Sequence, residues 1–181
     1  MDARTRAPVV ARSPVTVREV AFGVDAFYLS GRCSLPLAFW EQLTKSKAAA
    51  IDNEGPVPFE LGEVTFGVAP MGFGRYAIRL EHQAGYVGVT DSSKLPTLRF
   101  QPRAEFLHAI GVPGTVQWFR RVFTPLAGEL TVSVSRVDLF ADWQGWQPTA
   151  EDRFGFLSQA KLRDTHEDDN RLTGFSFGRR R

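Results

Sequence analysis

The chain has little of what a disulfide-stapled, zinc-bound or membrane-spanning protein requires. Its 181 residues include one cysteine, Cys33, which excludes both an intramolecular disulfide and a thiolate-rich zinc site. The three histidines are far apart in the sequence and offer no ligand spacing. Apolar runs such as 35–40 are much shorter than the ~20 residues that cross a bilayer, and no apolar signal stretch follows the N-terminal arginines. We therefore expect a cytoplasmic protein without a membrane span.

The chain also lacks a large excess of charge of either sign. Lysine and arginine total 22 and aspartate and glutamate total 20, so the net charge of +2 gives no long-range attraction to nucleic acid comparable to that of a histone-like protein. The basic residues are nevertheless mostly arginine, with 18 arginines against 4 lysines. A GC-rich genome explains this bias as well as selection for phosphate binding does, so the composition leaves both explanations open.

The strand and helix signals predict one α+β domain over residues 15–181, after a flexible lead over residues 1–14. Alternating β-branched and aromatic stretches predict strands over 16–31, 63–68, 75–82, 86–90, 97–101, 130–143 and 171–178. Apolar residues at three- and four-residue spacing predict helices over 35–50, 104–110, 113–125 and 150–161. The acidic stretch 163–170 is expected to be a loop. This order favours a mainly antiparallel sheet with helices packed on it, and it is compatible with two related βαβ halves.

The stretch 131–143, TVSVSRVDLFADW, is the most informative segment for chemistry. Because strand side chains alternate between faces, Arg136, Asp138 and Asp142 should share one face. Carboxylate oxygens are the ligands that Mg²⁺ or Mn²⁺ prefers, but at ~3.3 Å per residue the Cα atoms of the two aspartates lie about 13 Å apart. Asp138 is thus the better candidate ligand, with Asp142 as a supporting group. The alternative is an exposed ion pair between Arg136 and Asp138 that contributes little stability.

Two blocks, SRVDLFADWQGW (135–146) and TGFSFGRR (173–180), are similar to segments of the replication-initiation proteins of rolling-circle plasmids and related phage or integrative elements. The strand GVDAF (23–27) resembles the opening motif of that family. The segment FLHAIG (106–111) resembles the helix that precedes the family's arginine–aspartate strand. Together these blocks extend over most of residues 20–180, and the first two carry the distinctive part of the resemblance.

The resemblance implies a DNA-nicking and strand-transfer enzyme. In such initiators carboxylates hold a divalent metal, and a tyrosine attacks a phosphodiester at the origin and stays attached to the 5′ phosphate. Arg136, Asp138 and Asp142 fall on the family's arginine-x-aspartate-x-x-x-aspartate pattern, so the two aspartates are the expected ligands of Mg²⁺ or Mn²⁺. The family's tyrosine-containing strand follows the glycine-rich block, where this sequence stops. We therefore expect the nucleophile beyond Arg181 in a longer reading frame, and no nicking by this chain alone.

The remaining candidates are tyrosines and a pair of helical arginines. Tyr28, Tyr76 and Tyr86 lie among apolar neighbours in predicted strands, so we expect core or sheet-surface roles for them and no nucleophilic role. Arg120 and Arg121 lie opposite the apolar side of a predicted helix, which fits either a solvated face or contact with the DNA backbone.

The sequence thus predicts part of a rolling-circle replication initiator. It would bind origin DNA through Arg136, Arg120 and Arg121, work with a host helicase, and could form a homodimer. One alternative is a DNA-binding domain that recognises an origin without cutting it, which would keep its affinity in EDTA and tolerate Asp138→Ala. The other is a truncated, inactive remnant that binds neither Mn²⁺ nor origin DNA.

Overall fold

The computed structural model describes residues 16–155 and 162–178. The chain forms two compact units, Gly23–Phe140 and the combination of Met1–Phe22 with Ala141–Arg181. The first unit contains both helices and the buried apolar core. The second contains a short 3-10 helix and a two-stranded hairpin.

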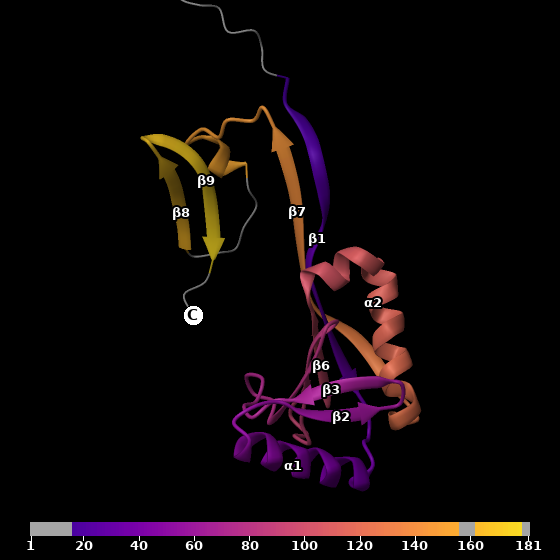
Figure 1. Ribbon diagram of the computed structural model, residues 1–181. Coiled ribbons are helices and arrows are strands. Elements are labelled where there is room, and N and C mark those ends of the chain that lie inside the picture. Colours follow the sequence, from indigo (N-terminus) through magenta and orange to yellow (C-terminus); the bar gives the residue numbers. More distant parts are fainter. Residues whose placement is uncertain (1–15, 156–161, 179–181) are drawn as a thin grey trace, which may run out of the picture. The chain divides into compact units, whose positions relative to one another are not determined.

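Seven strands form the main sheet (Figure 1). Their bounds are β1 Arg18–Arg32, β2 Val57–Leu61, β3 Val64–Val68, β4 Ile78–His82, β5 Gly85–Val89, β6 Leu98–Pro102 and β7 Thr131–Gln144. They follow the order β2-β3-β4-β5-β6-β1-β7, so that a five-stranded antiparallel meander is extended by β1 and β7. Tyr28 of β1 contacts Arg136 while Gly31 lies against Leu130, which shows that β1 and β7 also run in opposite directions.

A row of fully buried side chains defines one face of this sheet. Leu29 is paired with Phe100, Phe100 with Val87, and Val87 with Leu80, across strands β1, β6, β5 and β4. All four side chains have no exposed surface. Because successive residues of a strand point to opposite faces, the residues next to this row in sequence point away from the core.

Both helices cover the buried face. Phe39 of α1 (Leu37–Asp52) packs on Phe59, and Trp118 of α2 (Ala104–Ala127) packs on Phe66, with ring centroids 5.6 and 6.4 Å apart. Phe59 and Phe66 are paired across β2 and β3, so they share one face. Gly111, with φ of 69°, kinks α2 between its two helical segments. In the part of the chain that is described, neither helix has the length and apolar composition of a membrane span.

His82 is half-buried beside the core. Its ring stacks on Trp118 with centroids 5.6 Å apart, and its Nδ1 accepts a hydrogen bond from the backbone N–H of Ala84 at 3.0 Å. Burial lowers the pKa of His82 below its ordinary value near 6.5. The unfolded chain therefore takes up a proton at a higher pH than the folded one, so stability contributed by neutral His82 is lost as the pH falls below that ordinary value.

Lowering the pH from about 7 to about 5 should thus reduce the free energy of unfolding more in the wild type than in His82→Gln. Glutamine does not titrate and keeps an acceptor for the N–H of Ala84. Urea unfolding of both proteins at a series of pH values measures the difference. Equal pH dependence in the two proteins would contradict a lowered pKa of His82 in the folded chain.

The predicted α+β class is confirmed by the mainly antiparallel sheet and the two packed helices. The sequence pattern did not predict β2, because Pro56 and Pro58 interrupt its alternation. Strand β2 lies at the edge of the sheet, where a residue without a backbone N–H is tolerated. The structure shows that the missed strand completes the meander at this edge.

Two predictions for the C-terminal region are wrong. Residues 163–170, expected to be a loop, mostly belong to β8 (Leu162–Asp168), which pairs with β9 (Arg171–Gly178). Asp169 and Asn170 have φ of 48° and 60° and make the tight turn. Residues 164–170 are exposed, so acidic side chains fit this hairpin. In its described part, the helix expected over 150–161 is only the 3-10 turn Asp152–Phe154, and residues 156–161 lie outside the described residues.

Candidate nucleic-acid interface

The face of the sheet opposite the helices carries arginine side chains in adjoining positions. Arg99 of β6 is paired with Ser30 of β1 and with Gly88 of β5, and Gly88 is also paired with Arg79 of β4. Each of these residues is next in sequence to a member of the fully buried row, so each points away from the helices. We name this the open face, because neither of the described helices covers it; it is defined by Ser30, Arg79, Gly88 and Arg99, of which Ser30 and Gly88 are themselves buried.

Guanidinium groups and aromatic rings alternate across the open face. The guanidinium of Arg136 lies 5.1 Å from the ring centroid of Tyr28, and that of Arg99 lies 5.6 Å from Tyr28 and 5.4 Å from Phe73. Phe73 in turn lies 6.2 Å from the ring of Tyr86. Two further guanidinium groups approach Tyr86 at 5.6 and 5.2 Å, within the range of cation–π attraction. We name these residues the arginine–aromatic ladder: Arg136, Tyr28, Arg99, Phe73, Tyr86, Arg79 and Arg103.

A glycine lets the connection between β3 and β4 pack on the open face. A Cβ atom at Gly88 would lie 2.7 Å from Cγ of Tyr76 and 3.1 Å from Cδ1 of Phe73. Both distances are shorter than the roughly 3.5 Å of a normal carbon contact. Two backbone hydrogen bonds between Phe73 and Tyr76, at 2.9 and 3.1 Å, close the turn that carries these rings. The middle of the ladder therefore depends on the missing side chain at Gly88.

A pocket of about 480 Å³ opens beside the ladder. Arg75, Arg99 and Arg136 line it together with Tyr28 and Tyr76, and its described lining includes no carboxylate. Burial raises the pKa of Tyr76, and the neighbouring arginines only partly oppose that shift, so the phenol adds no negative charge to the pocket. The volume falls in the range of small-ligand sites, and the charge suits an anionic group such as a phosphate.

Carboxylates pair with both ends of the ladder, Glu81 with Arg79 and Asp138 with Arg136. Nε of Arg136 donates to Oδ1 of Asp138 at 2.9 Å, and Nη2 of the same guanidinium donates to Oδ2. Hydrogen bonding is the main reason that the pKa of Asp138 is lowered and that of Arg136 raised. The side chains are 48% exposed for Arg136 and 34% for Asp138. An exposed pair of this kind is weak, and an anionic ligand can compete for the guanidinium.

The two aspartates expected to bind a metal fall in different compact units. Asp142 is exposed and belongs to the other compact unit from Asp138. Within residues 16–155 and 162–178, no group of three or more histidine, cysteine or acidic side chains is placed to hold an ion. Since the carboxylate of Asp138 is paired with Arg136, the described residues as arranged do not fit Mg²⁺ or Mn²⁺. Metal binding by Asp138 and Asp142 stays a prediction.

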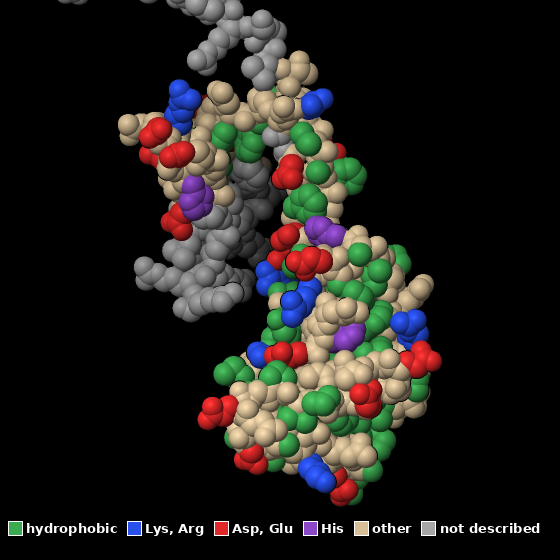
Figure 2. All heavy atoms as spheres, viewed as in Figure 1, with side chains coloured by type: hydrophobic (Ala, Val, Ile, Leu, Met, Phe, Trp, Pro, Cys, Tyr) green, Lys and Arg blue, Asp and Glu red, His purple; other side chains and the backbone are tan. Residues whose placement is uncertain are grey.

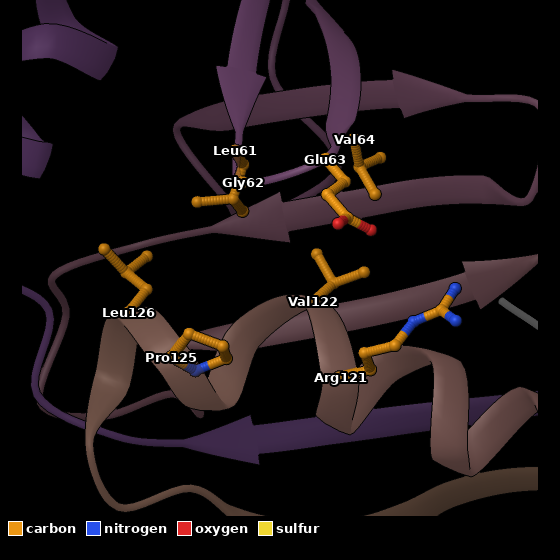
Figure 3. Close-up of a pocket in the computed structure, with 8 residues that line it drawn as sticks. All are labelled: Leu61, Gly62, Glu63, Val64, Arg121, Val122, Pro125 and Leu126. Carbon is orange, nitrogen blue, oxygen red and sulfur yellow. The ribbon is translucent and has the colours of Figure 1, made fainter.

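The two helical arginines lie away from the open face. Arg120 and Arg121 are exposed on α2, which packs on the buried face of the sheet. Arg121 lines a separate pocket of about 580 Å³ between α2 and the turn that joins β2 and β3. Figure 3 shows Arg121 on the α2 side of this pocket and Glu63 on the turn side. The structure therefore brings Arg136 together with Arg75 and Arg99, and leaves Arg120 and Arg121 at another surface.

Charged side chains of both signs are interspersed on the surface seen in Figure 2. This agrees with the near balance of 22 basic and 20 acidic residues. Long-range attraction of a polyanion is weak when the net charge is so small. The net charge alone therefore gives no reason to expect binding of a polyanion.

Sequence reasoning found Arg136 but missed Arg79, Arg99 and Arg103. A signal was present, because LRFQ (98–101) alternates apolar and polar residues and places Arg99 opposite to its buried neighbours. The missing information was the register between strands, which decides which arginine meets which ring. Tyr28, the ring that joins Arg136 to Arg99, is half-buried on the sheet surface.

Comparisons of the chain with family models, with curated proteins and with solved structures found no match. Its function must therefore be inferred from its own residues and their geometry.

Proposed function

We propose that the unit Gly23–Phe140 binds nucleic acid through its open face, and that the chain is the DNA-binding part of a rolling-circle replication initiator. The arginine–aromatic ladder is the observation that supports binding. Planar guanidinium groups match phosphate oxygens, and aromatic rings stack on unpaired bases. The initiator role rests on the resemblance of segments 135–146 and 173–180.

Single-stranded DNA suits this surface better than duplex. The ladder lies on a sheet face, whereas reading a duplex requires a helix or ribbon that enters a groove. The bases of an unpaired strand can stack on exposed parts of the rings while its phosphates lie against the guanidinium groups. The pocket lined by Arg75, Arg99 and Arg136 offers a place for one such phosphate.

Fluorescence anisotropy with a labelled single-stranded oligonucleotide tests the proposal. We expect the full chain to bind this oligonucleotide. The logarithm of the affinity should fall linearly with the logarithm of the salt concentration, with a slope of about 0.7 for each phosphate neutralised. The slope should be about 2 if the three pocket arginines each neutralise one phosphate. A duplex of the same sequence should bind more weakly, and polyglutamate is the control for unspecific charge attraction. Absence of binding at low salt, or equal affinity for polyglutamate, would contradict the proposal.

The same titration in EDTA and in Mn²⁺ separates binding from the metal chemistry that the resemblance implies. The ladder contains no metal ligand, so the affinity for DNA should persist in EDTA. If Asp138 also binds Mn²⁺, the ion should release Arg136 from its ion pair and tighten DNA binding in the wild type, but leave Asp138→Asn unchanged. An equal response of both proteins to Mn²⁺ would remove Asp138 as the ligand.

A further inference from the structure

Strand β7 is the last strand on one side of the described main sheet, and it carries exposed apolar side chains. In the described part of the chain, β1 is its one neighbour in that sheet. Val134, Val137 and Leu139 are 53%, 47% and 76% exposed. The opposite edge, β2, is five residues long and contains Pro58. Short strands, prolines and lysines normally keep an edge from pairing, and the described stretch 133–140 of β7 has no proline or lysine.

The charges of β7 make it complementary to itself in one arrangement. A two-fold axis perpendicular to the sheet pairs the strand antiparallel with the same strand of a second copy. Directly opposite residues must point to the same face of the sheet, so the axis lies where one residue faces its own equivalent. When that residue is Val137, Arg136 of each copy lies directly opposite Asp138 of the other. Parallel in-register pairing would instead set like charges side by side, which is destabilising.

We propose that the chain self-associates through β7, with two copies paired antiparallel about a two-fold axis at Val137. The Arg136–Asp138 pair within each copy then joins the pair of the other copy in a network of four charges. At the centre Val137 meets its equivalent, and Val134 lies opposite Phe140 on either side. These contacts cover the apolar edge and give paired backbone groups on both strands.

The proposed pairing has a consequence for the open face. Because the axis is perpendicular to the sheet, the sheets of the two copies continue into one another and their open faces lie on the same side. The two ladders then meet at Arg136. Self-association does not depend on nucleic-acid binding by the single chain. If the open face does bind nucleic acid, the dimer doubles the binding surface with two-fold symmetry.

Sedimentation equilibrium of the full chain across the micromolar range tests self-association. We expect a monomer–dimer equilibrium for the wild type and a monomer for Val137→Lys, since two ammonium groups would meet at the axis. Leu37→Lys is the matched control, because Leu37 is 74% exposed on α1 and this variant should dimerise normally. A wild type that stays monomeric throughout, or a Val137→Lys variant that dimerises like the control, would overturn the inference.

A charge exchange tests the register. Arg136→Asp puts acidic residues at both positions 136 and 138, and Asp138→Arg puts basic residues at both, so each variant alone should be monomeric. An equimolar mixture should form a heterodimer, because opposite charges then meet only between copies. Misfolding cannot produce this gain of association. If the wild type dimerises but the mixture stays monomeric, the register is wrong. DNA binding by Val137→Lys is measured separately. Because this variant should be a monomer, its affinity tests the proposed function independently of self-association.

Discussion

Replacing both Arg99 and Arg136 with alanine should lower the affinity of the chain for single-stranded DNA by about 100-fold. Hydrogen bonds to charged groups contribute about 1.5–3 kcal/mol, which is roughly tenfold or more in Kd for each arginine. Both guanidinium groups line the same pocket, and Tyr28 lies between them. Fluorescence anisotropy at low salt measures the loss, and circular dichroism checks that the variant is folded.

Arg120→Ala with Arg121→Ala is the matched control for this pair. It removes the same charge from α2, on the other side of the sheet, and should change the affinity only slightly. Lysine at positions 99 and 136 should give an intermediate affinity, because the charge remains but the planar fork is lost. A large loss of binding in the α2 variant, with the ladder variant unaffected, would place the DNA contacts on Arg120 and Arg121.

The largest loss of stability is expected from Phe100→Ala, at about 3–5 kcal/mol. Phe100 lies on β6 near the centre of the sheet and has no exposed surface. Its ring lies parallel to that of Phe119 at 5.5 Å and contacts Trp118 at 5.0 Å and Phe106 at 6.5 Å between centroids. Removal of the ring leaves a cavity that the paired strands on both sides cannot close.

Phe22→Ala provides the control for this substitution. Phe22 is 74% exposed, so its truncation should change the free energy of unfolding by less than about 0.5 kcal/mol. Urea denaturation of the three proteins gives the comparison. A cost for Phe100→Ala close to that for Phe22→Ala would contradict the central place of this ring in the core.

The local periodicity of the sequence predicted most of the helices and strands of the unit Gly23–Phe140. Alternating residues marked the strands of the meander, and the break at Gly111 before Pro113 marked the kink of α2. Two strands were not predicted. Strand β2 contains a proline that interrupts the strand pattern, and the acidic composition of β8 is typical of a loop. In both cases the strand is defined by its pairing partner, which a single segment does not reveal.

The candidate site was less predictable than the fold. The alternation of 131–143 correctly placed Arg136 and Asp138 on one face, and the structure joins them in the ion pair that was the alternative to a metal ligand. The ladder, however, combines residues from β1, β4, β5, β6 and β7 with Phe73 and Arg103, which lie in connections. Its composition depends on strand order and register, and neither was encoded in the spacing of any one motif.

Chemical-shift mapping of the isotope-labelled full chain with a single-stranded oligonucleotide tests the central claim most directly. At saturation, the largest changes should occur at the arginine Nε–H groups of Arg99 and Arg136 and at backbone amides of the open face on β1, β5 and β6. The amides of α2 around Arg120 and Arg121 should change little. Changes concentrated on α2, or none on the open face while the oligonucleotide is bound, would show that the arginine–aromatic ladder is not the binding surface.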